Sequence, residues 1–108
     1  MLSADFGHLE RDTRMVDASA AEWVHIDVMD GVFVPNISFG FPVLKAIRKA
    51  TAKFLDVHLM IVSPEKYVAR FAEAGADLVT FCKLISHTLH PQAKNSTHSL
   101  SSSKFQVV

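Results

Sequence analysis

The sequence predicts an α/β fold made of parallel strand–helix–strand units, and two observations carry this prediction. Two seven-residue stretches, Trp23 to Met29 and Phe54 to Met60, alternate polar and apolar side chains, as strands with two different faces do. Amphipathic stretches lie between such strands, so that strands and helices alternate with a period of roughly 30 residues. Strands connected in this way pair in parallel through right-handed crossovers.

The remaining elements follow from local signals. In order, we expect the end of a strand at 1–2, a surface helix over 7–18, a strand over 23–29, a helix beginning at 42, a strand over 54–60, a helix over 63–75 and a strand over 78–81. The last helix has the clearest ends, with Ser63 as N-cap, Pro64 in the first turn and Gly75 as C-cap. The loop over 31–40 is long, and such loops are often functional.

Composition sets limits on the partners and on the size of the fold. The chain has 108 residues, 49% hydrophobic and 20% charged, which suits one small domain and is too short for a complete eight-stranded barrel. The net charge is zero, so we expect neither nucleic acid nor a membrane as partner. No apolar run is long enough for a membrane span, and the N-terminus does not resemble a signal peptide. The single cysteine, Cys82, excludes an internal disulfide framework.

The composition changes near Cys82. Residues 1–82 hold 8 basic and 11 acidic side chains, whereas 83–108 hold three lysines, six serines and no acid. The second segment also lacks any helical or strand periodicity. We therefore expect a folded domain over 1–82 and an unstructured tail over 83–108.

Three side chains on the two polar strand faces form a candidate metal site. His25 and Asp27 are two residues apart on one strand, and His58 has a matching position on the next, 33 residues after His25. Imidazole and carboxylate groups bind divalent ions such as zinc, iron(II), manganese or cobalt, and three protein ligands leave positions open for a substrate. The alternative is a pair of hydrogen-bonded core histidines with Asp27 capping a turn. The second histidine at a matching position favours the metal site.

Longer motifs give the chain a family resemblance. The segment His25 to Gly40 reads H-I-D-V-M-D-G-V-F-V-P-N-I-S-F-G, and Leu55 to Met60 reads L-D-V-H-L-M. Together with L-S-A-D-F at 2–6 and A-G-A-D-L-V-T-F at 74–81, these motifs closely resemble the ribulose-phosphate 3-epimerase family. The resemblance extends over residues 1–81.

The resemblance implies the N-terminal half of a (β/α)8 TIM barrel, with about four parallel strands and three helices. It implies an isomerase of the pentose phosphate pathway that interconverts D-ribulose 5-phosphate and D-xylulose 5-phosphate by metal-dependent epimerisation at C3. The positions of His25, Asp27 and His58 match the family's ligands for a divalent metal (Zn, Fe(II), Mn or Co), and Asp27 also matches an acid/base catalyst. His58, Met29 and Met60 match residues on the substrate pocket, although spacing alone fits ordinary core packing of the methionines equally well.

The resemblance also implies what this chain lacks. A second catalytic aspartate, a fourth metal ligand and the phosphate-binding loops of the family come from later strands, so we expect this truncated chain to be inactive alone. A truncated gene model or an alternatively spliced product would explain the break at Cys82. The alternatives are a related hexulose-phosphate 3-epimerase and a non-catalytic half-barrel that acts only as an interaction partner. The expected partner is a pentulose 5-phosphate as substrate, and a homo-oligomer is also compatible with the sequence. The expected location is the cytoplasm, or a plastid if a transit peptide preceded Met1.

Overall fold

The sheet consists of parallel strands arranged in their order along the chain. A computed structural model describes residues 1–82 and the backbone of residues 105–107. The strands are β1 (Trp23–Met29), β2 (Phe54–Met60), β3 (Leu78–Phe81) and β4 (Phe105–Val107), and each pairs in parallel with the next. The predicted bounds of β1 and β2 are confirmed. The predicted α/β class is also confirmed, and the arrangement is consistent with part of a TIM barrel.

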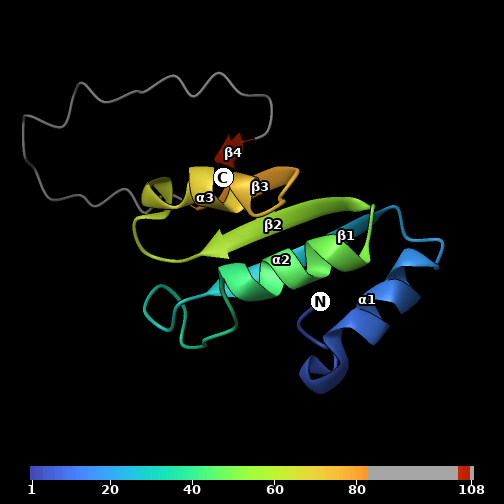
Figure 1. Ribbon diagram of the computed structural model, residues 1–108. Coiled ribbons are helices and arrows are strands. Elements are labelled where there is room, and N and C mark those ends of the chain that lie inside the picture. Colours follow the sequence, from blue (N-terminus) through green and yellow to red (C-terminus); the bar gives the residue numbers. More distant parts are fainter. Residues whose placement is uncertain (83–104, 108) are drawn as a thin grey trace, which may run out of the picture.

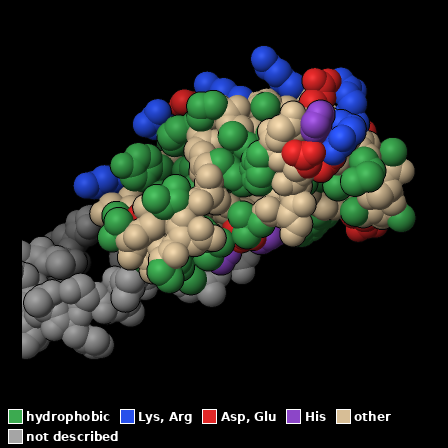
Figure 2. Space-filling view, turned by 90° about the horizontal axis from the view of Figure 1, so that it is seen from below, with side chains coloured by type: hydrophobic (Ala, Val, Ile, Leu, Met, Phe, Trp, Pro, Cys, Tyr) green, Lys and Arg blue, Asp and Glu red, His purple; other side chains and the backbone are tan. Residues whose placement is uncertain are grey.

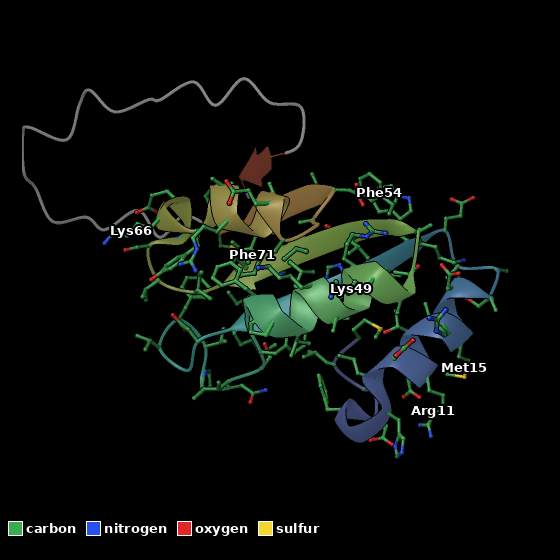
Figure 3. The ribbon with its side chains drawn as sticks, viewed as in Figure 1. Arg11, Met15, Lys49, Phe54, Lys66 and Phe71 are labelled. Carbon is green, nitrogen blue, oxygen red and sulfur yellow. The ribbon has the colours of Figure 1, made fainter. Side chains whose placement is uncertain are left out.

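Helices cover one face of this sheet (Figure 1). They are α1 (Leu9–Asp17), α2 (Phe41–Ala50) and α3 (Val68–Glu73), with short 3-10 helices η1 (Phe6–His8) and η2 (Pro64–Lys66) before α1 and α3. Figure 3 shows Phe71 of α3 lying toward α2, where its ring packs 4.5 Å from that of Phe41. Within residues 1–82, α2 joins β1 to β2 and α3 joins β2 to β3, as the sequence predicts.

Among the described residues, the core lies between the helices and the apolar rows of β1, β2 and β3. Its strand residues are Val24, Ile26, Val28, Leu55, Val57, Leu59, Val79 and Phe81, and its helix residues include Leu44, Ile47, Val68 and Phe71. The alternate side chains of β1 and β2 point to the other face, where every residue from Trp23 to Met29 in that row is exposed or only partly buried. The polar row is therefore left open for chemistry.

The third predicted helix differs from its prediction at its start. Ser63 has a left-handed backbone (φ 48°) and makes no capping hydrogen bond with its side chain, and η2 and α3 are separated at Tyr67. Ser63 does take the N-cap position with Pro64 in the first turn, as predicted, but the helix begins as a 3-10 turn, which is closed by the Tyr67 N–H donating to the Pro64 carbonyl. Gly75 follows the helix with φ 118°, a conformation that favours glycine.

The two ends of the chain also differ from expectation. Met1 and Leu2 do not form a strand, but the amino group of Met1 donates to the carbonyl of His25 at 3.0 Å, along the free edge of β1. Within the segment expected to be unstructured, Phe105–Val107 form β4, and the rest of 83–108 lies outside the described residues. In the described part of the chain, no helix has the length and apolar character needed to cross a membrane.

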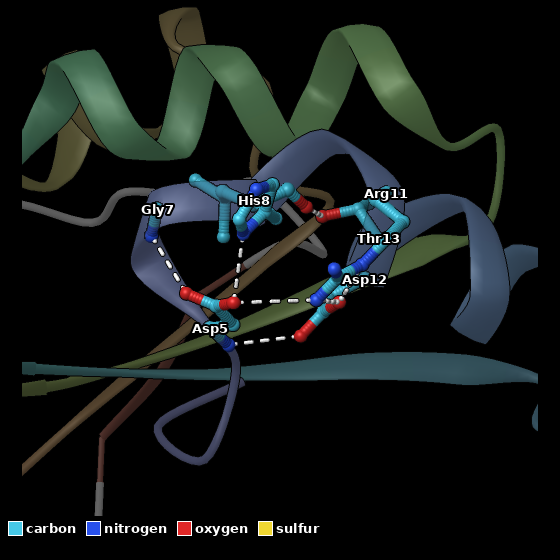
Figure 4. A network of polar contacts seen from close by, with 7 residues as sticks. Asp5, Gly7, His8, Arg11, Asp12 and Thr13 are labelled. Carbon is cyan, nitrogen blue, oxygen red and sulfur yellow. Dashed lines mark hydrogen bonds and ion pairs between the residues drawn. The ribbon is translucent and has the colours of Figure 1, made fainter.

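A network of charged side chains surrounds the start of α1. The Asp5 carboxylate accepts hydrogen bonds from the Gly7 N–H and from Arg11, and contacts the His8 ring, while Arg11 also donates to Asp12 (Figure 4). The space-filling view shows acidic, basic and histidine side chains gathered at that end of the molecule (Figure 2). Because the side chains of Asp5, His8 and Arg11 are largely exposed, the network orients the first turn and contributes little to stability.

Candidate metal centre

The register of β1 and β2 brings the predicted metal ligands together. Asp27 lies opposite His58, and His25 lies opposite Asp56. Since side chains alternate along a strand, all four lie on the face opposite the helices. Asp27 and His58 lie two residues before the carboxyl ends of β1 and β2, the end at which parallel α/β folds place their active sites, and His25 and Asp56 lie one step further from that end.

Asp27 is the centre of the cluster. Its Oδ1 atom lies 3.0 Å from His25 Nε2 and 3.4 Å from His58 Nδ1. One ligand atom from each of the three residues lies within 4.8 Å of both others. Asp27 and His58 are partly buried, whereas the side chain of His25 is 52% exposed. The site is therefore open on the His25 side.

The separations of Asp27 Oδ1 from the two imidazole nitrogens suit a divalent metal ion. Bonds of about 2.0–2.2 Å from an ion to nitrogen and oxygen place neighbouring ligand atoms about 3.0–3.5 Å apart in octahedral or tetrahedral geometry. The two contacts of Asp27 Oδ1 fall in this range. Two imidazoles and one carboxylate suit zinc, iron(II), manganese or cobalt, and they leave coordination positions for other ligands.

Asp56 orients His25 from the other side of its ring. His25 Nδ1 lies 2.8 Å from Asp56 Oδ2, so an N–H on Nδ1 donated to this carboxylate leaves Nε2 facing Asp27. Burial opposes the charged imidazolium, but the hydrogen bonds to Asp56 and Asp27 outweigh it and raise the pKa of His25. Asp56 reaches His25 because it lies two residues before His58 on the same face of β2 and directly opposite His25 in the register.

The two predicted substrate-pocket methionines lie side by side. Met29 pairs with Met60 at the ends of β1 and β2, one step beyond Asp27 and His58, and both are partly buried. A pocket of about 430 Å³ reaches Asp27 from the side of the N-terminal residues and α1. A second cavity, of about 200 Å³, lies between Asp30 and α3. Neither cavity includes the two histidines among its lining residues.

Sequence reasoning missed one residue that supports this end of β1. The Ser38 hydroxyl donates to the Asp27 carbonyl at 3.0 Å and accepts from the Met29 N–H at 2.9 Å. The sequence gives no signal for this contact, since Ser38 lies in a loop without periodicity. Asp30 stabilises the turn at Gly31, because its Oδ1 accepts hydrogen bonds from the N–H groups of Val32 and Phe33.

The chain spans about a third of the length of the curated relatives that it matches. A ribulose-phosphate 3-epimerase from Synechocystis is 58% identical over 80 residues, 74% of this chain and 35% of the relative. The cytoplasmic isoform from rice is 46% identical over 81 residues, 75% of this chain and 36% of the relative. A chloroplastic ribulose-5-phosphate-3-epimerase from Arabidopsis thaliana is 47% identical over 90 residues, 83% of this chain and 32% of the relative.

The family model described as the ribulose-phosphate 3 epimerase family matches residues 1–99. This match continues beyond residue 81, where the motifs quoted from the sequence end. It includes both strands of the candidate metal centre and the loop between β1 and α2. The chain belongs to the ribulose-phosphate 3-epimerase family.

Proposed function

We propose that this chain supplies the metal-binding part and one acid/base group of a site that epimerises D-ribulose 5-phosphate at C3. His25, Asp27 and His58 would hold a divalent ion. The observation that carries the proposal is the convergence of their three ligand atoms within 4.8 Å of one another, on one face of two paired parallel strands. Membership of the family supports the choice of reaction and of a pentulose phosphate as substrate.

Removal of a proton from the carbon next to a ketone leaves negative charge on the substrate oxygens. A bound divalent ion supplies positive charge that stabilises these oxygens. His25 and His58 serve as neutral ligands, and Asp56 keeps the Nε2 atom of His25 directed toward the site. Met29 and Met60 form an apolar edge that limits the access of water.

Asp27 carries the proton. Its Oδ1 atom faces both histidines, while among the described residues Oδ2 makes no hydrogen bond and can accept the C3 proton. Inversion at C3 needs a second acid on the opposite side of the substrate. Within residues 1–82, the other carboxylate on this face is Asp56, which is held by His25. Asp27 alone would therefore return the proton to the face from which it came.

The experiment follows C3 of ribulose 5-phosphate by NMR in D₂O, with the purified chain and Co²⁺ or Zn²⁺. We expect exchange of the C3 hydrogen for deuterium without accumulation of xylulose 5-phosphate. Asp27→Asn abolishes the exchange, since an amide does not accept the proton. Glu22→Gln, which alters an exposed acid just before β1, leaves the exchange unchanged and serves as the control.

If the wild type and Asp27→Asn exchange the C3 hydrogen at the same measurable rate, Asp27 is excluded as the base. Conversion to xylulose 5-phosphate that is lost in Asp27→Asn would instead overturn the expectation that the chain is inactive alone. In the full reaction, such a site would work in the pentose phosphate pathway. The cytoplasmic and chloroplastic names of the rice and Arabidopsis relatives leave both compartments open for this activity.

A further inference from the structure

The two strands that carry the candidate ligands end at the same level. Met29 pairs with Met60, and each lies two residues after a ligand, Asp27 or His58. Beyond this pair the strands separate, β1 into the loop over 31–40 and β2 into the segment before η2 (Figure 1). Two ladder pairs follow the Asp27–His58 pair, so contacts that hold the strand ends together beyond Met29 and Met60 add to the ladder in fixing the distance between the two ligands.

Asp30 connects the two segments with one carboxylate. Its Oδ1 accepts from the N–H groups of Val32 and Phe33, each at 2.9 Å. Its Oδ2 accepts from the N–H of Val62 at 2.8 Å, which lies 32 residues away along the chain. The hydrogen bond from Val62 is the largest cause that lowers the pKa of Asp30, so the carboxylate is ionised at neutral pH.

The loop that Asp30 holds is itself attached to the backbone of Asp27. Ser38 bridges the Asp27 carbonyl and the Met29 N–H through its hydroxyl, and the Ser38 N–H donates to the Met29 carbonyl at 3.2 Å. An antiparallel bridge joins Asp30 to Ile37. A continuous series of hydrogen bonds therefore runs from Asp27 through the loop and Asp30 to Val62, four residues after His58.

We propose that Asp30 is a positioning residue that ties the loop after β1 to the segment after β2 and so fixes the separation of the metal ligands Asp27 and His58. The inference rests on the proposed metal site. It assigns Asp30 a task beyond the turn with Gly31, because one of its oxygens accepts from the turn and the other accepts from Val62, two residues after the end of β2.

One substitution separates these two tasks. In Asp30→Asn, the amide oxygen can still accept from Val32 and Phe33, whereas the amide NH₂ group faces the Val62 N–H and accepts nothing. The turn is preserved and the connection to β2 is lost. Asp30→Asn also removes one negative charge near the site. Glu65→Gln on the adjacent η2, an exposed acid, removes a charge in the same region and is the matched control.

The test measures Co²⁺ affinity and the visible spectrum of the Co²⁺ complex for the full chain, at a temperature where circular dichroism shows every variant folded. We expect Asp30→Asn to weaken Co²⁺ binding by about 2- to 30-fold, the range for coupling between neighbouring positions, and to change the spectrum. Glu65→Gln changes neither. Hydrogen exchange without metal gives an independent readout, in which Asp30→Asn speeds exchange at Val62 and across 31–40.

The outcomes separate the two proposals. A wild-type chain that binds no Co²⁺ overturns the metal site and this inference together. If the wild type binds Co²⁺ and Asp30→Asn binds it equally well, the positioning role alone is overturned. The same holds if Asp30→Asn weakens Co²⁺ binding no more than Glu65→Gln does. Faster exchange at Val62 with unchanged Co²⁺ affinity shows that the contact is structural only and also overturns it.

Discussion

Replacement of Asp56 by asparagine weakens metal binding at the candidate centre without touching a ligand. In the native chain, the carboxylate of Asp56 lies 2.8 Å from His25 Nδ1 and keeps the ring in the orientation and tautomer that present Nε2 to Asp27. The asparagine has the same shape, yet it is a neutral acceptor that lowers the basicity of the ring. It can also turn its NH₂ group toward Nδ1 and favour the wrong tautomer.

The magnitude follows from the surroundings of the pair. Partners that orient a metal-bound histidine are worth about 10–100-fold in affinity, or about 1.4–2.7 kcal/mol. The Asp56 side chain is 18% exposed but that of His25 is 52% exposed, so water screens part of the interaction. The amide oxygen of asparagine also retains some of the hydrogen bond. We therefore expect the lower part of the range, about 10- to 30-fold.

Isothermal titration with Zn²⁺, in competition with a chelator of known affinity, measures this change. Glu22→Gln, which removes an exposed charge before β1, is the control and should match the wild type. An NMR titration of the metal-free chain gives a second readout, because the raised pKa of His25 should fall when Asp56 is neutral. Wild-type affinity in Asp56→Asn together with an unchanged His25 pKa would refute the orienting role.

Two further predictions concern stability. Gly75→Ala should lower the free energy of unfolding, measured by urea titration, by about 1–3 kcal/mol. The residue has φ 118°, and an added Cβ would lie 2.5 Å from Arg48 Cγ. An unchanged urea midpoint would contradict this and show that Arg48 moves aside at no cost. The hydrogen bond from the Thr51 hydroxyl is the main cause that lowers the pKa of Asp17 in the folded chain below 3.8. Ionised Asp17 therefore stabilises the fold at a pH above its pKa in the unfolded chain. This stabilisation is lost as the pH falls through the lower pKa of the folded chain. Thr51→Val should raise the Asp17 pKa toward 3.8 by NMR, and a constant pKa would contradict that cause.

Much of the fold was predictable because it depends on local patterns. The alternation in β1 and β2 marks their bounds, and the same alternation places His25, Asp27 and His58 on one face. The third helix was less predictable. Ser63 and Pro64 resemble a standard helix start, but the chain takes a left-handed turn at Ser63, and nothing local signals that turn.

The geometry of the candidate centre was not predictable from sequence. Pairing of Asp27 with His58 depends on the register between two strands, and a shift of one residue would move every side chain of one strand to the other face of the sheet. The same limit applies to the contact of Asp30 with Val62, which spans 32 residues and forms only when both strand ends are in place. Sequence spacing identifies candidate ligands, whereas the contacts that orient them are long-range.

Titration of the purified chain with Co²⁺ tests most directly whether His25, Asp27 and His58 form a metal centre. We expect one ion per chain at this centre, and loss of that binding in the double variant His25→Ala, His58→Ala, with the fold checked by circular dichroism. The convergence of the three ligand atoms on this face is the basis of that expectation. Equal Co²⁺ binding by the wild type and the folded double variant would contradict it and place the metal elsewhere in the chain.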